Sequence, residues 1–195
     1  MNKELPIYKL DISEEDGALV TAIALVENPA IEVDFLAFSK QQTFQFSDDK
    51  MIMRGPFMIP NHKMYRNIKG EEFYAIFERP AIEKISQQYL QKGFNSSFNI
   101  EHNSAIDAGC YLIESFIIDR EVGINPPKGF ESLPDGSWFG SVKCTDPAVW
   151  ADIKAGKRKG FSVEGVFTIS PITEPQPSID DLAEAYIAAY KALKG

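Results

Sequence analysis

The sequence predicts a protein of the α+β class, with a sheet-rich core that is closed or nearly closed and helices that interrupt the strands. Two observations support this prediction. Short apolar and β-branched runs recur along the chain with turn residues between them, which is typical of many short strands. Three other segments space their apolar residues as helices do, and each begins with a proline or serine that suits a helix start.

The first expected strand covers residues 18–26, an apolar run that reads as a buried strand and stops at Glu27-Asn28-Pro29. Residues 41–50 are polar enough to form a mobile connection, and residues 119–137, rich in Gly, Pro, Asp and Glu, predict a long loop or hairpin tip. The other strand patterns cover residues 35–38, 44–46, 51–59, 72–77, 98–101, 110–118, 138–144 and 161–169.

The first expected helix has Pro80 in its first turn and ends at Gly93. The second has Asp146 as its N-cap and Pro147 in the first helical position, and it ends at Gly156. Their inward faces are Ile82, Ile85, Tyr89 and Leu90 in the first helix, and Val149, Trp150 and Ile153 in the second.

The length of 195 residues fits one domain with a small appendage. We expect the domain at residues 1–170, with residues 18–38 as a strand and the segment after it. A Pro-rich connector follows at 171–177 and a C-terminal helix at 178–195. That helix would either pack on its own domain or serve in dimerisation or docking.

Composition excludes several classes of function. The chain has 20 Lys+Arg and 28 Asp+Glu, so its net charge of 20 − 28 is −8, which argues against a nucleic-acid binder held by phosphate contacts. No run approaches the roughly 18 apolar residues of a membrane span. The first residues lack the apolar core of a signal peptide, which predicts a cytoplasmic protein without a membrane partner.

The chain has only two cysteines and two histidines. A zinc site would need all four to converge, so no metal is expected, and Cys110 and Cys144 are expected as reduced core residues. An imidazole base must therefore be His62 or His102. His62 lies in a polar turn, whereas His102 lies where a strand meets a loop, a common position for catalytic side chains.

The segment Lys159-Gly160-Phe161-Ser162-Val163-Glu164-Gly165 is the most informative one. On a strand, Ser162 and Glu164 face one side, while Phe161 and Val163 face the other. His102 is the better base for a Ser162 nucleophile, and Glu164 could hold its imidazole in the right tautomer. The alternative is a strand with a polar outer face and no chemistry. The order helix then strand also differs from the nucleophile elbow of α/β-hydrolases.

Five stretches occur in an order that is expected of one known family: Asn99-Ile100-Glu101-His102, Gly109-Cys110-Tyr111-Leu112-Ile113-Glu114-Ser115-Phe116, Trp138-Phe139-Gly140-Ser141-Val142-Lys143, Asp146-Pro147-Ala148-Val149-Trp150 and Lys159-Gly160-Phe161-Ser162-Val163-Glu164-Gly165. Residues 72–165 thereby resemble the phage prohead (capsid maturation) serine proteases of the XkdF-type branch. The resemblance implies the herpesvirus assemblin fold, a small, mostly antiparallel β-barrel surrounded by helices. It also implies Ser162 as nucleophile and His102 as base.

In that family the third catalytic residue lies on a strand after the serine, and its closest likeness here is residues 22–30, before the histidine. We therefore expect a circular permutant, whose last barrel strand has moved to the N-terminus. The third position then falls on Ala22, which cannot orient an imidazole. The acid would be Glu164, next Glu114, then Glu27 or Glu101, unless the site is a Ser–His dyad.

The resemblance implies a serine endopeptidase that cleaves scaffold and capsid-protein extensions, with self-cleavage, inside the immature capsid in the host bacterial cytoplasm. It implies a homodimer and no cofactor. The alternative is a catalytically inactive structural or scaffold-associated capsid component that retains the fold. The absent acid at Ala22 favours this alternative, and the presence of Ser162 and His102 argues against it. A non-proteolytic esterase is a weaker third possibility.

Overall fold

The structure is a computed structural model that describes residues 5–13, 15, 17–27, 45–47 and 50–172. The expected strand at 35–38, the C-terminal helix at 178–195 and most of the 171–177 connector lie outside the described residues. Within the described part of the chain, no helix is both long and apolar enough to cross a membrane.

The described elements agree in order with most of the expected strands and with the first two helices. The expected strand at 161–169 is split in two. The strands β1, β5 and β8 were not predicted from the sequence. The elements are β1 Ile7–Asp11, β2 Val20–Val26, β3 Gln45–Ser47, β4 Ile52–Met58, β5 Met64–Ile68, β6 Glu71–Phe77, α1 Arg79–Gln91, the 3-10 helix η2 Phe94–Ser96, β7 Phe98–Ile100, β8 Asn103–Asp107, β9 Cys110–Ile117, β10 Trp138–Cys144, α2 Pro147–Lys154, β11 Gly160–Gly165 and β12 Thr168–Pro171.

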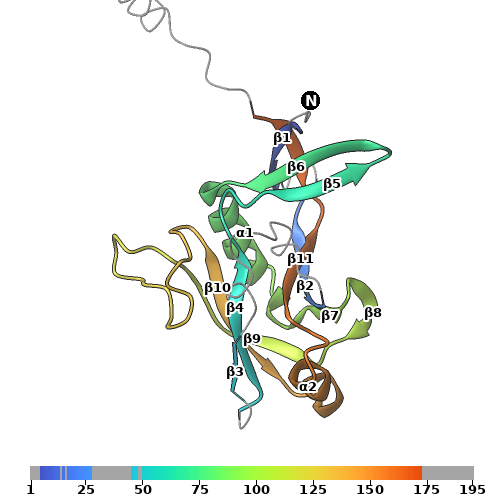
Figure 1. Cartoon of the computed structure of the whole chain (residues 1–195), viewed down its shortest axis with the longest axis vertical. Coiled ribbons are helices and arrows are strands. Elements are labelled where there is room, and N and C mark those ends of the chain that lie inside the picture. Colours follow the sequence, from blue (N-terminus) through green and yellow to red (C-terminus); the bar gives the residue numbers. More distant parts are fainter. Residues whose placement is uncertain (1–4, 14, 16, 28–44, 48–49, 173–195) are drawn as a thin grey trace, which may run out of the picture.

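The strands form three four-stranded sheets, in the orders β12-β1-β6-β5, β3-β4-β10-β9 and β11-β2-β7-β8 (Figure 1). The α+β class is thus confirmed. The small barrel is not confirmed, because the described strands do not close into one hydrogen-bonded ring. Each sheet instead ends in two strands, such as β11 and β8, that lack a second ladder partner among the described residues.

An aromatic cluster joins two of the sheets to α1. The Phe57 ring of β4 makes edge contacts with Trp138 of β10 and Phe161 of β11, each with centroids 4.9 Å apart. Tyr89 of α1 packs on Trp138 at 5.5 Å. All four side chains are buried. Since aromatic side chains bury large areas, this cluster is the central contact of the core.

Both described helices begin where they were expected, but the side chain of Leu90 does not lie where it was expected. Asp146 caps α2, where its carboxylate accepts hydrogen bonds from the backbone N–H groups of Ala148 at 2.7 Å and Val149 at 3.4 Å. In α1, Ile82, Ile85 and Tyr89 are fully buried, as expected. The prediction that Leu90 points inward is wrong, because its side chain is exposed on the adjacent side of the helix.

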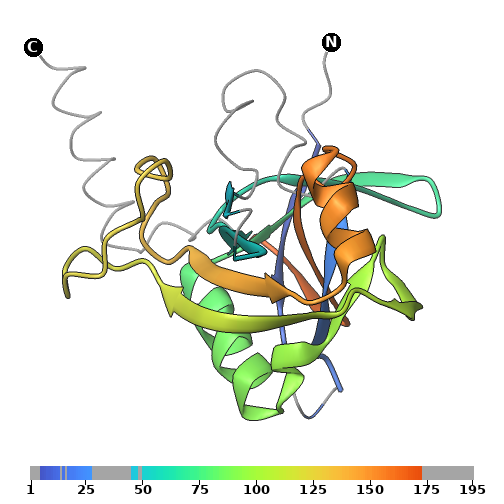
Figure 2. The same ribbon diagram turned by 90° about the horizontal axis from the view of Figure 1, so that it is seen from below.

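The 119–137 loop carries a small core of its own. Ile118, Phe130 and Leu133 pack with Phe139 and Ile59 as a second buried cluster. In Figures 1 and 2 this loop extends from the β9–β10 end of the molecule, away from the β7–β8 hairpin.

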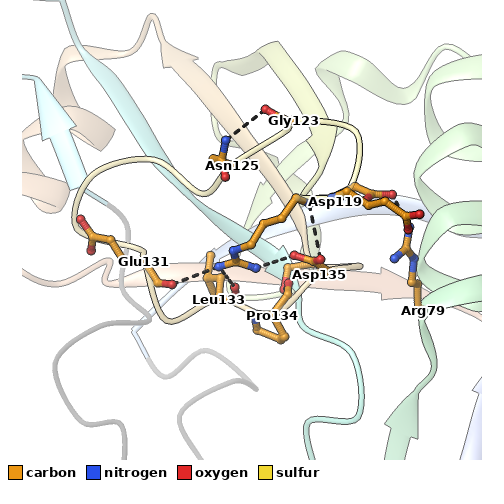
Figure 3. Close-up of polar contacts among 11 residues, drawn as sticks. Arg79, Asp119, Gly123, Asn125, Glu131, Leu133, Pro134 and Asp135 are labelled. Atoms are coloured by element: carbon orange, nitrogen blue, oxygen red, sulfur yellow. Dashed lines mark hydrogen bonds and ion pairs between the residues drawn. The ribbon is translucent and has the colours of Figure 1, made fainter.

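Ion pairs fasten the same loop (Figure 3). Arg120 pairs with Asp135, and its guanidinium also donates to the carbonyls of Leu133 at 2.9 Å and Glu131 at 3.1 Å. Arg79 of α1 pairs with Asp119 at 2.5 Å. The loop is therefore a packed, hydrogen-bonded segment that is attached to α1.

We predict that Gly140→Ala destabilises the protein by about 1–3 kcal/mol, because an added Cβ would lie 2.4 Å from Phe57 Cε2 and 2.7 Å from the Glu114 carbonyl oxygen. Phe57 cannot move away, since it is held between Trp138 and Phe161. Urea denaturation measures the change. The control is Val122→Ala at a side chain that is 69% exposed, with an expected change below about 0.5 kcal/mol. Equal effects of the two variants would contradict the prediction.

The Arg79–Asp119 pair predicts a pH dependence of stability. The Arg79 guanidinium holds the pKa of the Asp119 carboxyl below its usual value. The unfolded chain has the higher pKa, of about 3.9, so the contribution of Asp119 is complete above that pH and is lost as the pH falls through the folded pKa. The difference in unfolding free energy between wild type and Asp119→Asn should stay constant from neutral pH to about pH 5 and shrink below about pH 4. Urea denaturation across this range, with Glu121→Gln as a control in the same loop, tests it. A difference that is unchanged at the lowest pH would refute it.

Candidate active site

The sheet β11-β2-β7-β8 places Ser162, Asn99 and Glu164 on one face. Ser162 pairs in register with Ala24 of β2, and Ala24 pairs with Asn99 of β7. Residues paired in this way project to the same side of a sheet, as do residues two apart on a strand. Glu164, which pairs with Ala22, therefore shares the face. Phe161 lies on the other side, in the aromatic cluster.

His102 reaches this face from a tight turn. It follows Glu101 between β7 and β8, and both residues have a positive φ, of 51° and 59°. Two such residues in succession are the favoured connection of a short hairpin, although residues other than glycine seldom adopt this conformation. His102 Nδ1 lies 3.4 Å from Glu164 Oε2, with the imidazole 43% and the carboxylate 31% exposed.

The turn is held in place through Glu101. Its carboxylate pairs with Arg158 at 2.5 Å and accepts a hydrogen bond from the Glu27 backbone N–H at 2.8 Å. Glu101 thus links the β7–β8 turn to the segment before β11 and to the end of β2. Both contacts are made by Glu101 Oε1, and they fix the hairpin that carries His102.

Asn99 holds the carboxylate that contacts His102. Its side-chain amide donates to Glu164 Oε2 at 2.8 Å, and Asn99 is only 5% exposed. A hydrogen bond to a carboxylate is among the stronger ones in proteins, so Asn99 fixes the position of Glu164. No role for Asn99 was predicted from the sequence, although the Asn99-to-His102 stretch is one of the five that carry the resemblance.

Ser162 is 8% exposed on the shared face. The hydrogen bonds of the described residues include none between the Ser162 hydroxyl and the His102 imidazole. The structure thus brings His102 and Glu164 together and places Ser162 on the same face without a closed Ser–His hydrogen bond. Such contacts are often long in the absence of substrate and tighten when it binds.

The other acids considered from the sequence lie elsewhere. Glu114 is on β9, in a different sheet, where it accepts a hydrogen bond from Ser141 and lies 3.9 Å from Arg54. Glu27 is 3.7 Å from Lys159. Glu164 is directly across from Ala22, so a carboxylate occupies the strand beside the position at which the expected acid is missing.

Two hollows border the strand that carries Ser162. One is a largely apolar cavity of about 270 Å³, whose lining includes Phe57, Phe161, Ser162 and the second histidine, His62. The other is a polar cleft of about 350 Å³ next to Glu164 and Asn99. Ser162 lines the apolar cavity, whereas the polar cleft is lined by Glu164 and Asn99 but not by Ser162.

Comparison with known proteins assigns the chain to a protein family. Residues 41–170, about two thirds of the chain, match the family described as "Putative phage serine protease XkdF". The chain belongs to this family. The matched region contains Ser162, His102, Glu164 and Asn99, and it begins after β2. No curated protein and no solved structure matched the chain.

Membership of this family confirms the expected XkdF-type phage serine protease, while the prohead role, the assemblin fold and the circular permutation stay predictions. Among the described residues of this XkdF-family chain, no group of three or more His, Cys, Asp or Glu side chains could hold a metal ion. Cys110 and Cys144 are free thiols and both are buried, as expected for core residues. The face that carries Ser162, His102 and Glu164 brings together a hydroxyl, an imidazole and a carboxylate, the three groups that serine hydrolases use.

We predict that Asn99→Ala destabilises the protein by about 1–3 kcal/mol, because it removes the amide that binds the half-buried Glu164 carboxylate. Asn125→Ala is the matched control. The Asn125 amide donates to the Gly123 carbonyl at 3.2 Å in an exposed part of the loop (Figure 3), so its loss should cost less than about 0.5 kcal/mol. Chemical denaturation of both variants decides, and an Asn99→Ala effect no larger than the control would argue against the anchoring role.

Proposed function

We propose that this protein is a phage prohead serine endopeptidase in which Ser162 is the nucleophile, His102 the general base and Glu164 the third member. The observation that carries the proposal is the 3.4 Å contact between His102 Nδ1 and Glu164 Oε2, on the sheet face that Ser162 shares. Membership of a phage serine protease family supports it.

The mechanism follows from the atoms that face each other. In the proposed mechanism Nδ1 carries a proton toward Glu164 Oε2, 3.4 Å away, and this tautomer leaves Nε2 free to accept the proton of Ser162. Ser162 Oγ attacks the peptide carbonyl carbon while its proton passes to His102 Nε2, and backbone N–H groups stabilise the oxyanion. The imidazolium then protonates the leaving amine, and water releases the acyl group by the same steps. Asn99 keeps Glu164 in position through this cycle.

The substrates that we propose are scaffold protein and capsid-protein extensions inside the immature capsid, in the host bacterial cytoplasm. Self-cleavage would occur in the Pro-rich 171–177 connector. We also propose a homodimer, with the segment 178–195, which the sequence predicts to be helical, as one candidate surface. These assignments come from the resemblance to prohead proteases and require no cofactor.

We further propose that the chain is a circular permutant of the assemblin fold. The position of β2 supports this, because β2 pairs antiparallel with β11 and parallel with β7, and so lies between the strands that lead to the nucleophile and the base. A strand that was moved from the C-terminal end to the N-terminal end of the chain would keep such a place in the sheet. Glu164 then compensates for the missing acid from the neighbouring strand.

The second candidate function is a catalytically inactive capsid component that keeps the fold. The absence of a Ser162–His102 hydrogen bond favours it. The family match and the His102–Glu164 contact favour the protease. One experiment separates the two.

We predict that Ser162→Ala lowers cleavage of co-expressed scaffold and major capsid protein by at least about 10³-fold, because the nucleophile is lost. Cleavage is measured by gel and intact mass. Ser86→Ala is the matched control, since Ser86 is equally buried but lies on α1, where its hydroxyl donates to the Glu83 carbonyl. Undiminished cleavage by Ser162→Ala would refute the assignment. Intact substrates with the wild-type protein would identify the inactive component.

A further inference from the structure

The two cysteines of the chain lie opposite each other on neighbouring strands. Cys144, at the end of β10, pairs in register with Cys110, at the start of β9. They are the only cysteines in the sequence, and both are buried, at 0% and 4% exposure. Thirty-four positions apart in the sequence (144 − 110), they meet only because the two strands pair.

The backbone hydrogen bonds define which kind of pair this is. The N–H of Thr145 donates to the carbonyl of Gly109 at 2.8 Å, one residue outside the cysteines on each strand. The N–H of Cys144 instead points to the other side, where it donates to the Met51 carbonyl at 2.9 Å. Cys110 and Cys144 are therefore a non-hydrogen-bonded pair, in which Cα atoms lie about 4.5 Å apart and side chains are closest. That spacing falls within the range of about 4.4–6.8 Å that a disulfide requires.

The two thiols differ in acidity. Hydrogen bonding between them lowers the pKa of Cys144 and raises that of Cys110. Each sulfur also contacts a backbone carbonyl at 3.3 Å, that of Asp146 for Cys144 and that of Ala108 for Cys110. Because the thiolate is the nucleophile, Cys144 is the sulfur that reacts first with an oxidant.

We propose that Cys110 and Cys144 are a redox-sensitive pair that closes to a cross-strand disulfide under oxidising conditions. With a peroxide as oxidant, the Cys144 thiolate attacks one peroxide oxygen and becomes a sulfenic acid, while the other oxygen leaves as water after protonation. The Cys110 thiol then attacks the Cys144 sulfur, an S–S bond forms, and a second water leaves. Two thiols lose two protons and two electrons in total, and the peroxide is reduced to two waters.

The position of the pair gives the disulfide a consequence. Cys110 follows β8, whose hairpin with β7 carries His102. Cys144 lies two residues before Asp146, the N-cap of α2, which leads to β11 and Ser162. The bond would therefore join the segment that carries the candidate base to the one that carries the candidate nucleophile. It would also restrict the unfolded chain between residues 110 and 144.

The test uses the full-length protein, reduced and then treated with hydrogen peroxide. We expect intact mass to fall by two hydrogen atoms, titratable thiols to fall from two to none, and a proteolytic map to show one peptide pair that joins Cys110 to Cys144. The melting temperature should rise by about 5–10 °C and return when a reductant is added. Cys110→Ala and Cys144→Ala should each abolish the rise.

Two results would overturn the proposal. One is a native protein that keeps both thiols while the same protein in urea is oxidised, which would mean that burial excludes the oxidant. The other is a disulfide between two chains instead of within one. The readouts are mass and melting temperature, so the outcome is independent of whether the protein proves to be a protease.

Discussion

Aromatic packing around Phe57 is the constraint on which the rest of the structure depends. Phe57 contacts Trp138 within its own sheet and Phe161 of the sheet that carries the candidate site. Tyr89 of α1 packs on Trp138 and so attaches the helix to this cluster. Because Phe161 is fixed in this cluster, the strand cannot slip by one residue without exposing it, and a slip would turn Ser162 inward. The core therefore decides which side chains of β11 reach the outer face.

The sequence predicted those elements whose apolar residues face the core. Examples are β2, β10 and α1, and the N-cap Asp146 correctly indicated the start of α2. β8 was missed because all five of its residues are exposed, so no apolar alternation marks it. β1 and β5 each bury one residue, which is too weak a pattern to detect. The described strands do not form the closed barrel that was expected. Pairing between strands distant in sequence leaves no local pattern from which it could be predicted.

For the candidate site, alternation along one strand was enough to put Ser162 and Glu164 on one face. To choose among the candidate acids, one must know to which sheet each strand belongs. Glu114 is excluded from the site only because β9 belongs to another sheet, where Arg54 and Ser141 contact its carboxylate. The role of Asn99 depends on a contact between residues 65 positions apart. The Asn99-to-His102 stretch indicated that this position matters, but its partner could not be predicted from the sequence.

The contacts of Glu101 have a mechanical consequence. Through its carboxylate, the turn that carries His102 is attached to Arg158, four positions ahead of Ser162, and to the end of β2. The hairpin that carries His102 and the segment that leads to Ser162 are therefore mechanically coupled. A displacement of the hairpin would move the segment in the same direction. Relative alignment of imidazole and hydroxyl is then less sensitive to movement of this end of the sheet than either position is by itself.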